Sequence, residues 1–369
     1  MKPNKFISQF VLYPASLLYG AGVGVRNMMF KSGIFKQRSF QVPVIVVGNI
    51  AVGGTGKTPH AEYIISLLKK NHTVGVLSRG YGRRTHGFRM VDDKSTPRTV
   101  GDEPYQMYHK FGGNKVFFAV CEDRVRGIEN MLKFHPEISV FVLDDAFQHR
   151  YVKPSVAIVL MEYSHPIFND SLLPYGRLRE PADSVERADI VVVTKCPSDA
   201  KPLEFRMLKH NLNLFQYQKL FFSKFTYRTP VPLFPDVAKS VESFKWLDKD
   251  DTLLAVCGIG NPRPFIEHLR SFGALVRVKV FNDHHYYKER DFKEIAQRFA
   301  QLKGNHKFIM TTEKDAVRIL SSNEFPDKLK PFIYFIPIEV EFEGLPGGYS
   351  FDDTIEKHIR NARFAVKKK

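Results

Sequence analysis

The chain has 369 residues, and its composition, 43% hydrophobic and 13% aromatic without a low-complexity block, excludes a disordered protein and suffices for two domains with separate cores. Lysine and arginine outnumber the acidic residues by 55 to 39, a formal net charge of +16 that favours an anionic partner such as nucleic acid, a phosphorylated substrate or an acidic membrane. Cys121, Cys196 and Cys257 match neither zinc-ligand nor disulfide spacing, which indicates a reducing cytoplasm.

The first expected element is an apolar helix within residues 1–40. The segment Phe6 to Val25 carries no charge, and its 20 residues would just span a hydrocarbon core, although Pro14 and three glycines weaken that interpretation. Three alternatives stay open: a helix lying in the membrane interface, a helix packed on the domain, and a transmembrane or secretory segment. An interfacial helix would direct Phe6, Phe10, Leu17, Leu18, Met28, Met29 and Phe30 toward lipid, with Lys31, Lys36 and Arg38 near the headgroups.

From Gln41 onward, short apolar strands alternate with helical stretches, which predicts an α/β fold whose mainly parallel sheet is covered by helices. The expected strands are Val42–Val47, Thr73–Leu77, Val116–Val120, Ser139–Leu143, Val156–Leu160, Ile190–Thr194, Thr252–Cys257, Ala274–Val280, Lys307–Thr311 and Phe332–Ile336. The expected helices are Lys57–Lys70, Arg124–Phe134, Leu203–Asn211, Arg263–Phe272 and Glu289–Leu302. Prolines and charges interrupt the pattern at Tyr227–Asp251, so we predict a core domain at 41–235 and a smaller α/β domain at 236–369 that closes a cleft.

The loop "AVGGTGKT", residues 51–58, follows the first strand of the expected sheet and precedes a helix. It satisfies the phosphate-loop consensus G-x-x-x-x-G-K-[ST] except at Ala51. This context predicts a P-loop NTPase-like ATP site rather than an ordinary glycine-rich turn, and since ATP is cytoplasmic, it argues against secretion. The main chain of Gly53, Gly54, Thr55 and Gly56 would bind phosphate oxygens, Lys57 would reach the β- and γ-phosphates, and the Thr58 hydroxyl would bind Mg²⁺.

An acidic pair, Asp144 and Asp145, ends the buried strand within "ISVFVLDDAFQH". A carboxylate at the carboxyl end of a strand beside a phosphate loop is suited to hold the magnesium shell. Two acids that begin a solvated turn are the alternative. With the phosphate loop upstream, the sequence favours contact with Mg²⁺ or its water ligands.

Four further segments accompany these motifs: "LSRGYGRR" at 77–84, "GDEP" at 101–104, "LLPYGRLREP" at 172–181 and "FNDHH" at 281–285. Together with "GGTGKT" and "LDDAFQH", and in this order, they resemble the tetraacyldisaccharide 4'-kinase family, the lipid A 4'-kinases. The resemblance extends over nearly the whole chain, from the apolar helix to "TTEKDAVR" at 311–318. Six ordered segments are far more specific than one phosphate loop.

The resemblance implies ATP- and Mg²⁺-dependent transfer of the γ-phosphate to the 4'-hydroxyl of a tetraacylated glucosamine disaccharide 1-phosphate, the lipid A precursor. It implies a peripheral or monotopic enzyme at the cytoplasmic face of the bacterial inner membrane, with the N-terminal helix on the anionic membrane surface. It implies neither a nucleic-acid nor a protein partner. The basic charge of the chain agrees with this set of anionic ligands.

The resemblance also implies an aspartate–histidine pair as the base. Asp102 of "GDEP" matches the aspartate and His284 matches the histidine, although His285 stands next to it, and Asp102 as an acidic helix cap is the alternative. Glu103 is a further candidate for the metal or ATP site. The candidates for contact with the lipid substrate are Arg79, Tyr81, Arg124, Gln148, His149, Arg177 and Arg179.

Two other functions are weighed against the kinase. A nucleotide-driven switch or metallochaperone NTPase would also contain this loop, and "VVVTKCP" at 191–197 vaguely resembles a guanine-reading loop, but Pro197 stands where its aspartate is expected. A DNA- or RNA-dependent ATPase would agree with the charge. No helix-turn-helix, zinc-finger or RNA-binding aromatic signature supports it.

Overall fold

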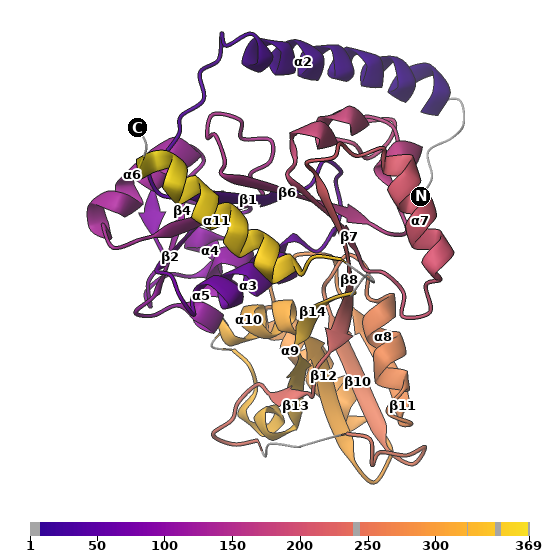
Figure 1. Ribbon diagram of the computed structural model, residues 1–369. Coiled ribbons are helices and arrows are strands. Elements are labelled where there is room, and N and C mark those ends of the chain that lie inside the picture. Colours follow the sequence, from indigo (N-terminus) through magenta and orange to yellow (C-terminus); the bar gives the residue numbers. More distant parts are fainter. Residues whose placement is uncertain (1–7, 239–243, 323, 344–347, 368–369) are drawn as a thin grey trace.

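The computed structural model describes residues 8–238, 244–322, 324–343 and 348–367. At the N-terminal side, a π-helical turn, Ser8–Leu12, continues into helix α2, Tyr13–Lys31, which lies along one edge of the molecule (Figure 1). Most of the remaining chain forms two sheets with helices on both faces. The larger sheet lies next to α2, and the smaller one lies at the opposite end of the molecule (Figure 1).

The larger sheet has nine strands in the order β14-β8-β7-β6-β1-β5-β2-β4-β3, and all pairs are parallel except the two edge pairs. The predicted mainly parallel α/β sheet is therefore confirmed. The strands are β1 Val44–Gly48, β2 Val74–Ser78, β3 Arg89–Met90, β4 Val116–Val120, β5 Val140–Asp144, β6 Val156–Glu162, β7 Ile190–Thr194, β8 Lys219–Tyr227 and β14 Ile338–Phe342.

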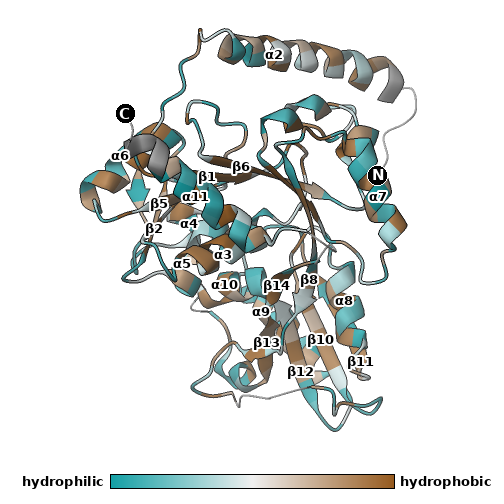
Figure 2. Ribbon diagram, in the orientation of Figure 1, coloured by the Kyte–Doolittle hydropathy of each residue, from teal (hydrophilic) through white to brown (hydrophobic). Residues whose placement is uncertain are grey.

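Hydrophobic residues are concentrated in these central strands, as the brown colour of β6 shows (Figure 2). Successive side chains of β1 enter different cores, because a strand directs them alternately to its two faces. One face is covered by α3 Lys57–Leu68, α4 Pro97–Val100, α5 Asp102–Phe111 and α11 Phe351–Lys367, and the other by α6 Arg124–Phe134 and α7 Pro202–Leu212.

The smaller sheet has five strands in the order β11-β10-β12-β13-β9, of which only β9 runs antiparallel. Its strands are β9 Val231–Pro232, β10 Thr252–Cys257, β11 Leu275–Val280, β12 Lys307–Thr312 and β13 Ile333–Ile336. Helix α8, Arg263–Arg270, packs on one face, and α9 Glu289–Ala300 and α10 Glu313–Leu320 pack on the other. Short 3-10 turns occur at Ile167–Asn169, Ala182–Arg187 and Asp327–Phe332.

The division between the sheets differs from the predicted boundary at residue 235. Strand β9 precedes that boundary and belongs to the smaller sheet, whereas β14 and α11 follow it and belong to the larger one. Strand β14 returns because it pairs with β8 along its whole length, from Ile338 opposite Tyr227 to Phe342 opposite Ser223. The smaller sheet is thus inserted between two adjacent strands of the larger sheet.

Helix α2 exposes many of the apolar side chains that we expected to face lipid. Leu18 is 77% exposed, and Phe10, Leu17 and Met28 are also exposed. Phe30 was expected in this set, but it is only 6% exposed, because it packs under the Arg150 guanidinium and against the Tyr151 ring. Met29 is partly buried, and Phe6 lies outside the described residues.

Across the described ranges, no helix combines the length and the apolar character needed to cross a membrane.

Candidate active site

The phosphate loop connects the carboxyl end of β1 to the amino end of α3. Gly53 and Gly56 have φ angles of +114° and +86°, and a Cβ at Gly56 would lie 2.6 Å from the Phe225 ring, so glycine is required there. Ala51, where the consensus has glycine, forms an antiparallel bridge with Leu178. This extended conformation is open to any residue, which explains why alanine is tolerated.

Thr55 fixes the middle of the loop. Its hydroxyl accepts a hydrogen bond of 2.8 Å from Asn49 Nδ2, and its carbonyl accepts one of 2.9 Å from Thr194 Oγ1. Gly54 faces the Lys195 amine, which would lie 3.9 Å from a Cβ at that position. The loop therefore presents its main chain at a helix N-terminus, beside two lysines, Lys57 and Lys195, which is a suitable environment for phosphate.

Asp144 is the least satisfied acid of this region. The residue is 1% exposed, and neither carboxyl oxygen has a hydrogen-bond partner. Burial, with the nearby charges of Glu103 and Asp145, raises its pKa to about 7. Asp145, with a positive φ of 46°, lies 3.7 Å from Lys57 Nζ and 3.4 Å from Arg179 Nη1. A divalent cation would supply the countercharge that Asp144 lacks.

Glu103 links the phosphate loop to the smaller sheet. Its Oε1 accepts a hydrogen bond of 2.9 Å from Lys314 Nζ, and its carboxylate also bonds to the Thr58 hydroxyl. Burial acts to raise the pKa of Glu103, but Lys314, Thr58 and Lys57 outweigh it and lower the pKa to about 2. Glu103 is therefore a permanent anion next to the loop.

The four predicted metal residues, Thr58, Glu103, Asp144 and Asp145, lie around this point. The described residues contain no preassembled cluster of three His, Cys, Asp or Glu side chains suited to a metal. Such a cluster is unnecessary for nucleotide-bound Mg²⁺, which takes most of its ligands from phosphates and water and only one or two from protein. The unpaired carboxylate of Asp144 and the hydroxyl of Thr58 fit that requirement.

Asp102 and His284 are 182 positions apart, yet His284 Nδ1 lies 3.3 Å from Asp102 Oδ2. Asp102 is the first residue of α5 and His284 lies in the loop after β11, so each sheet contributes one member. The N-cap of α5 is Gly101, so Asp102 is not the helix cap considered above. Burial acts to raise the pKa of Asp102, but hydrogen bonds and charge from His284 and Arg318 outweigh it, and the pKa is lowered.

Arg318 of α10 joins the same group. Its side chain is 1% exposed; its Nε donates to Asp102 Oδ2 at 3.0 Å, and its Nη2 lies 3.2 Å from His284 Nδ1. Its Nη1 donates to the Gly258 carbonyl at 2.9 Å and to Asp315 at 3.1 Å. Arg318 therefore fixes the Asp102 carboxylate relative to the smaller sheet.

The two adjacent histidines have different partners. His285 Nε2 lies 2.9 Å from Asp291 Oδ2, whereas His284 lies beside Asp102 and, with ring centroids 6.1 Å apart, beside Tyr81. Tyr81 is 78% exposed, so its ring is accessible to a substrate. Only the His284 side chain joins the group formed with Asp102.

The other candidates for lipid contact fall into two groups. Arg124 is buried and donates to the carbonyls of Cys121, Glu122 and Asp145; its main-chain N–H donates to His149, and Gln148 donates to the Asn49 carbonyl. These three side chains thus support the strand ends. Burial, with the charge of Arg124, lowers the pKa of His149 to about 4. Arg177 pairs with Asp170, Arg179 is half-buried against Asp145, and Arg79 is exposed.

Sequence reasoning did not assign Asn49, Lys314 or Arg318. The last two belong to "TTEKDAVR", where they are four residues apart on α10 and therefore on one helix face. The sequence signal that could have identified Lys314 and Arg318 is a helix that begins directly after a strand and carries two cations on one face. Their acidic partners lie over 200 positions earlier, so the pairing itself has no local signal.

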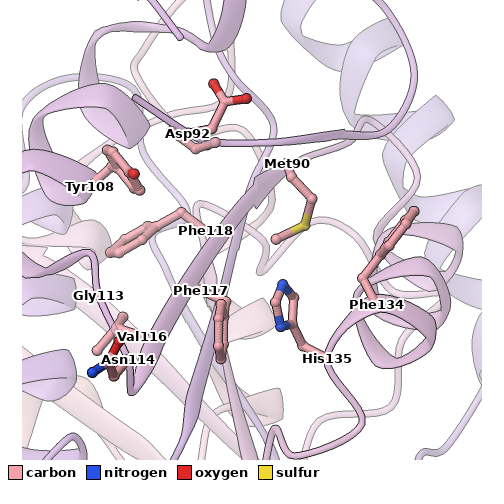
Figure 3. Close-up of a pocket in the computed structure, with 11 residues that line it drawn as sticks. Met90, Asp92, Tyr108, Gly113, Asn114, Val116, Phe117, Phe118, Phe134 and His135 are labelled. Atoms are coloured by element: carbon pink, nitrogen blue, oxygen red, sulfur yellow. The ribbon is translucent and has the colours of Figure 1, made fainter. Parts of the chain in front are cut away.

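A separate cavity of about 640 Å³ lies beside β4 (Figure 3). Met90, Tyr108, Phe117, Phe134 and His135 are among its lining residues. It includes Val116, the first residue of β4, and thus lies at the opposite end of the parallel strands from the phosphate loop. None of the predicted site residues lines it.

The family profile described as tetraacyldisaccharide-1-P 4'-kinase matches residues 8–360. The tetraacyldisaccharide 4'-kinase of Bacteroides thetaiotaomicron is 48% identical over 337 residues, covering 89% of this chain and 88% of that protein. That of Phocaeicola vulgatus is 44% identical over 359 residues, covering 96% and 97%. The crystal structure of LpxK from Aquifex aeolicus in complex with ATP is similar with a TM-score of 0.71 and 27% identity, covering 95% of this chain and 98% of that chain.

Proposed function

Since the chain belongs to the tetraacyldisaccharide 4'-kinase family, we infer that it transfers the γ-phosphate of ATP to the 4'-hydroxyl of a tetraacyl glucosamine disaccharide 1-phosphate in lipid A biosynthesis. ATP is the phosphate donor and Mg²⁺ the metal. The relatives and the solved structure reported above favour the kinase over the nucleotide-switch alternative. We further propose roles for the residues described above.

One observation carries the assignment of roles: Asp102 contacts His284, and the next residue, Glu103, contacts Thr58 of the phosphate loop. The proposed base and the proposed phosphate site are thus joined through the first turn of α5. In a lipid kinase the acceptor hydroxyl must reach the phosphate that the loop binds. This arrangement supports an acceptor that enters between the two sheets.

His284 would accept the proton of the 4'-hydroxyl. This role requires the tautomer in which Nδ1 donates its proton to Asp102, and the approach of Arg318 Nη2 to Nδ1 at 3.2 Å is then not a hydrogen bond. In this tautomer Nε2 carries the free lone pair that a general base needs. The Asp102 carboxylate stabilises the imidazolium that forms, and its lowered pKa keeps it charged throughout the neutral range. As the oxygen attacks phosphorus, the bond from the γ-phosphorus to the β,γ-bridging oxygen breaks and ADP leaves.

The loop main chain and Lys57 would bind the phosphates and balance the charge that develops on them. Thr58 and Asp144 would hold Mg²⁺, which, when bound, neutralises phosphate charge. Arg179, 3.4 Å from Asp145, would keep that carboxylate oriented beside Lys57.

Three ion pairs support a closing role for the smaller sheet. Helix α10 meets α5 through Arg318–Asp102 at 3.0 Å, Lys314–Glu103 at 2.9 Å and Glu313–Lys110 at 2.8 Å. We propose that opening of the two units separates the base from the phosphate loop and that closure assembles the site.

We also propose that α2 places the enzyme on the cytoplasmic face of the inner membrane. Its exposed apolar side chains, including Phe10, Leu17 and Leu18, are suited to the acyl boundary, and the net charge of +16 favours anionic headgroups. A lipid acceptor would then reach the site laterally.

The test uses γ-labelled ATP, Mg²⁺ and the disaccharide 1-phosphate lipid in detergent. We expect label in the lipid with wild-type protein and a loss of roughly 10²-fold or more in rate for Asp102→Asn and for Lys57→Met. Absence of label in the wild-type reaction would reject the kinase function. Unchanged rates in either variant would reject the role proposed for that residue.

A further inference from the structure

Helix α2 makes specific polar contacts with the larger domain. The Ser16 hydroxyl donates to the Leu172 carbonyl at 2.8 Å, and the Tyr19 hydroxyl donates to the Arg179 carbonyl at 2.8 Å. Gly20 packs so closely that a Cβ there would lie 2.8 Å from Leu172 Cδ1. One face of the helix is therefore docked in a defined register on residues 172–180, while the apolar face described above stays exposed.

Arg26, further along α2, contacts two separate segments. Its Nη2 donates to the Gln148 carbonyl at 2.6 Å, and its Nη1 lies 3.7 Å from Glu180 Oε1. Both segments end next to the phosphate loop. Arginine suits this position because its planar guanidinium serves two acceptors at once.

The first segment leads from Arg26 into the loop through hydrogen bonds. Gln148 Nε2 donates to the Asn49 carbonyl at 2.6 Å, and Asn49 Nδ2 donates to the Thr55 hydroxyl at 2.8 Å. The bond between Asn49 and Thr55 is buried, whereas the bond between Gln148 and Asn49 is partly buried. The position of Thr55 thus depends on Gln148, and that of Gln148 on Arg26.

The second segment reaches the entrance of the loop and the acidic pair. Glu180 follows Arg179, whose main-chain N–H donates to the Ile50 carbonyl at 2.7 Å and whose guanidinium lies 3.4 Å from Asp145. The Val52 N–H donates to the Arg177 carbonyl at 2.7 Å. A displacement of this segment would move both the loop entrance and Asp145.

Charge makes the second segment sensitive to Arg26. Glu180 is 1% exposed and is surrounded by Arg187, with which it is paired, Arg150 and Arg26. A buried carboxylate loses stability when one of its cations is removed, because the other groups cannot relax to replace it. Loss of Arg26 therefore disturbs both segments together.

We propose that Arg26 is a positioning residue for phosphotransfer: by contacting the Gln148 and Glu180 segments, it makes α2 a structural support of the phosphate loop in addition to any membrane contact. The conformation that binds ATP then depends on docking of α2. The proposal builds on the phosphotransfer function above, but its first consequence is on ATP binding and requires no acceptor.

The test compares full-length wild type, Arg26→Met, Arg26→Lys and Lys31→Met. Lys31 is the matched control, because it lies on the same helix, is exposed, and its replacement removes the same charge. The Kd of a fluorescent ATP analogue is measured with Mg²⁺ in detergent without acceptor, so that membrane binding does not contribute. Then kcat and the KM values of ATP and of the lipid are measured in the same detergent.

We expect Arg26→Met to lose roughly 10- to 100-fold in ATP affinity and in kcat/KM for ATP, with the lipid KM little changed. Lys31→Met is expected to stay within about two-fold, and Arg26→Lys to be intermediate, because an ammonium restores the charge without the fork geometry. Wild-type ATP affinity and kcat/KM in Arg26→Met, or an equal loss in Lys31→Met, would overturn the proposal.

Circular dichroism and thermal unfolding accompany each measurement. If Arg26→Met does not fold, Arg26→Gln takes its place, with the same expected direction and the same refuting result. A wild-type protein that binds ATP but leaves the lipid unlabelled would reject the kinase function, while the ATP-affinity comparison would still decide on Arg26. The two failures are therefore distinguishable.

Discussion

The adjacent histidines can be compared directly. We expect His284→Gln to lower kcat and His285→Gln to lower the free energy of unfolding. The His284 side chain is 43% exposed, and its contacts with Asp102 and Arg318 are at 3.3 and 3.2 Å, so its loss should cost less than about 1 kcal/mol of unfolding free energy. As the proposed base, its removal should lower kcat by roughly 10²- to 10⁴-fold. In terms of the activation barrier this is about 3 to 5 kcal/mol.

His285 has the opposite profile. It bonds to Asp291 at 2.9 Å and stacks on Phe281 with ring centroids 4.5 Å apart, while Asp291 retains the Lys288 N–H as a second donor. Its loss should therefore cost about 1 to 2 kcal/mol of unfolding free energy and leave kcat within a few-fold.

The assay pairs label transfer at saturating ATP and lipid with urea unfolding monitored by circular dichroism. Both variants keep a side chain of similar polarity, so that the comparison isolates the imidazole. A wild-type kcat in His284→Gln, or a larger rate loss in His285→Gln than in His284→Gln, would refute the reasoning. Equal destabilisation of the two variants would contradict the assignment of their contacts.

Three further predictions concern the metal site, the ion pairs between α5 and α10, and membrane binding by α2. Burial raises the pKa of Asp144 from 3.8 to about 7, so the folded protein retains a proton that the unfolded chain loses, and stability falls as the pH rises through this window. Asp144→Asn should abolish phosphate transfer. In urea unfolding of the nucleotide-free protein, the same variant should have an unfolding free energy at least about 1 kcal/mol higher than wild type near pH 8, and this difference should be absent near pH 3. Lys314→Met should raise the KM of ATP several-fold, because Glu103 loses its 2.9 Å partner; an unchanged KM would show that the contact is dispensable. Replacing Leu17 and Leu18 by serine should lower the vesicle-bound fraction in flotation without changing ATP affinity, and undiminished binding would argue against a membrane role for this face of α2.

Most of the parallel strands could be predicted, because β1, β2, β5, β7 and β10 are short, wholly buried apolar runs. The parallel strand β8, which is only partly buried, was not predicted. Strands β4, β7 and β10 have the predicted bounds. Strand β14 was not predicted, because its sequence "IEVEF" alternates acidic with apolar residues. The acidic residues form ion pairs with residues in or next to β8, Glu339 with Arg228 and Glu341 with Lys224. Such a strand is recognisable only once its partner, over a hundred residues earlier, is known.

In the active site, too, features with a local sequence signal could be predicted, and contacts between distant residues could not. The phosphate loop is local, and its glycines, lysine and threonine follow from the conformation that phosphate binding requires. The contacts of Arg318 are not local, because its partner Asp102 lies 216 positions earlier and only the fold brings the two together. Arg124 was predicted to contact the lipid substrate, but it is buried and donates to main-chain carbonyls. The sequence cannot distinguish these two roles for a basic residue at the end of a strand.

The pairing of β14 with β8 has a consequence for how the protein can be divided. The chain leaves the larger sheet at Tyr227 and re-enters it at Ile338, directly opposite, and the Arg228 N–H donates to the Pro337 carbonyl at 2.9 Å. The two ends of the insertion therefore lie as close together as the two arms of a hairpin. A short turn could replace the whole smaller sheet without stretching the strands on either side. The product would keep the phosphate loop and Asp102 but lose His284, and so would separate nucleotide binding from activation of the acceptor.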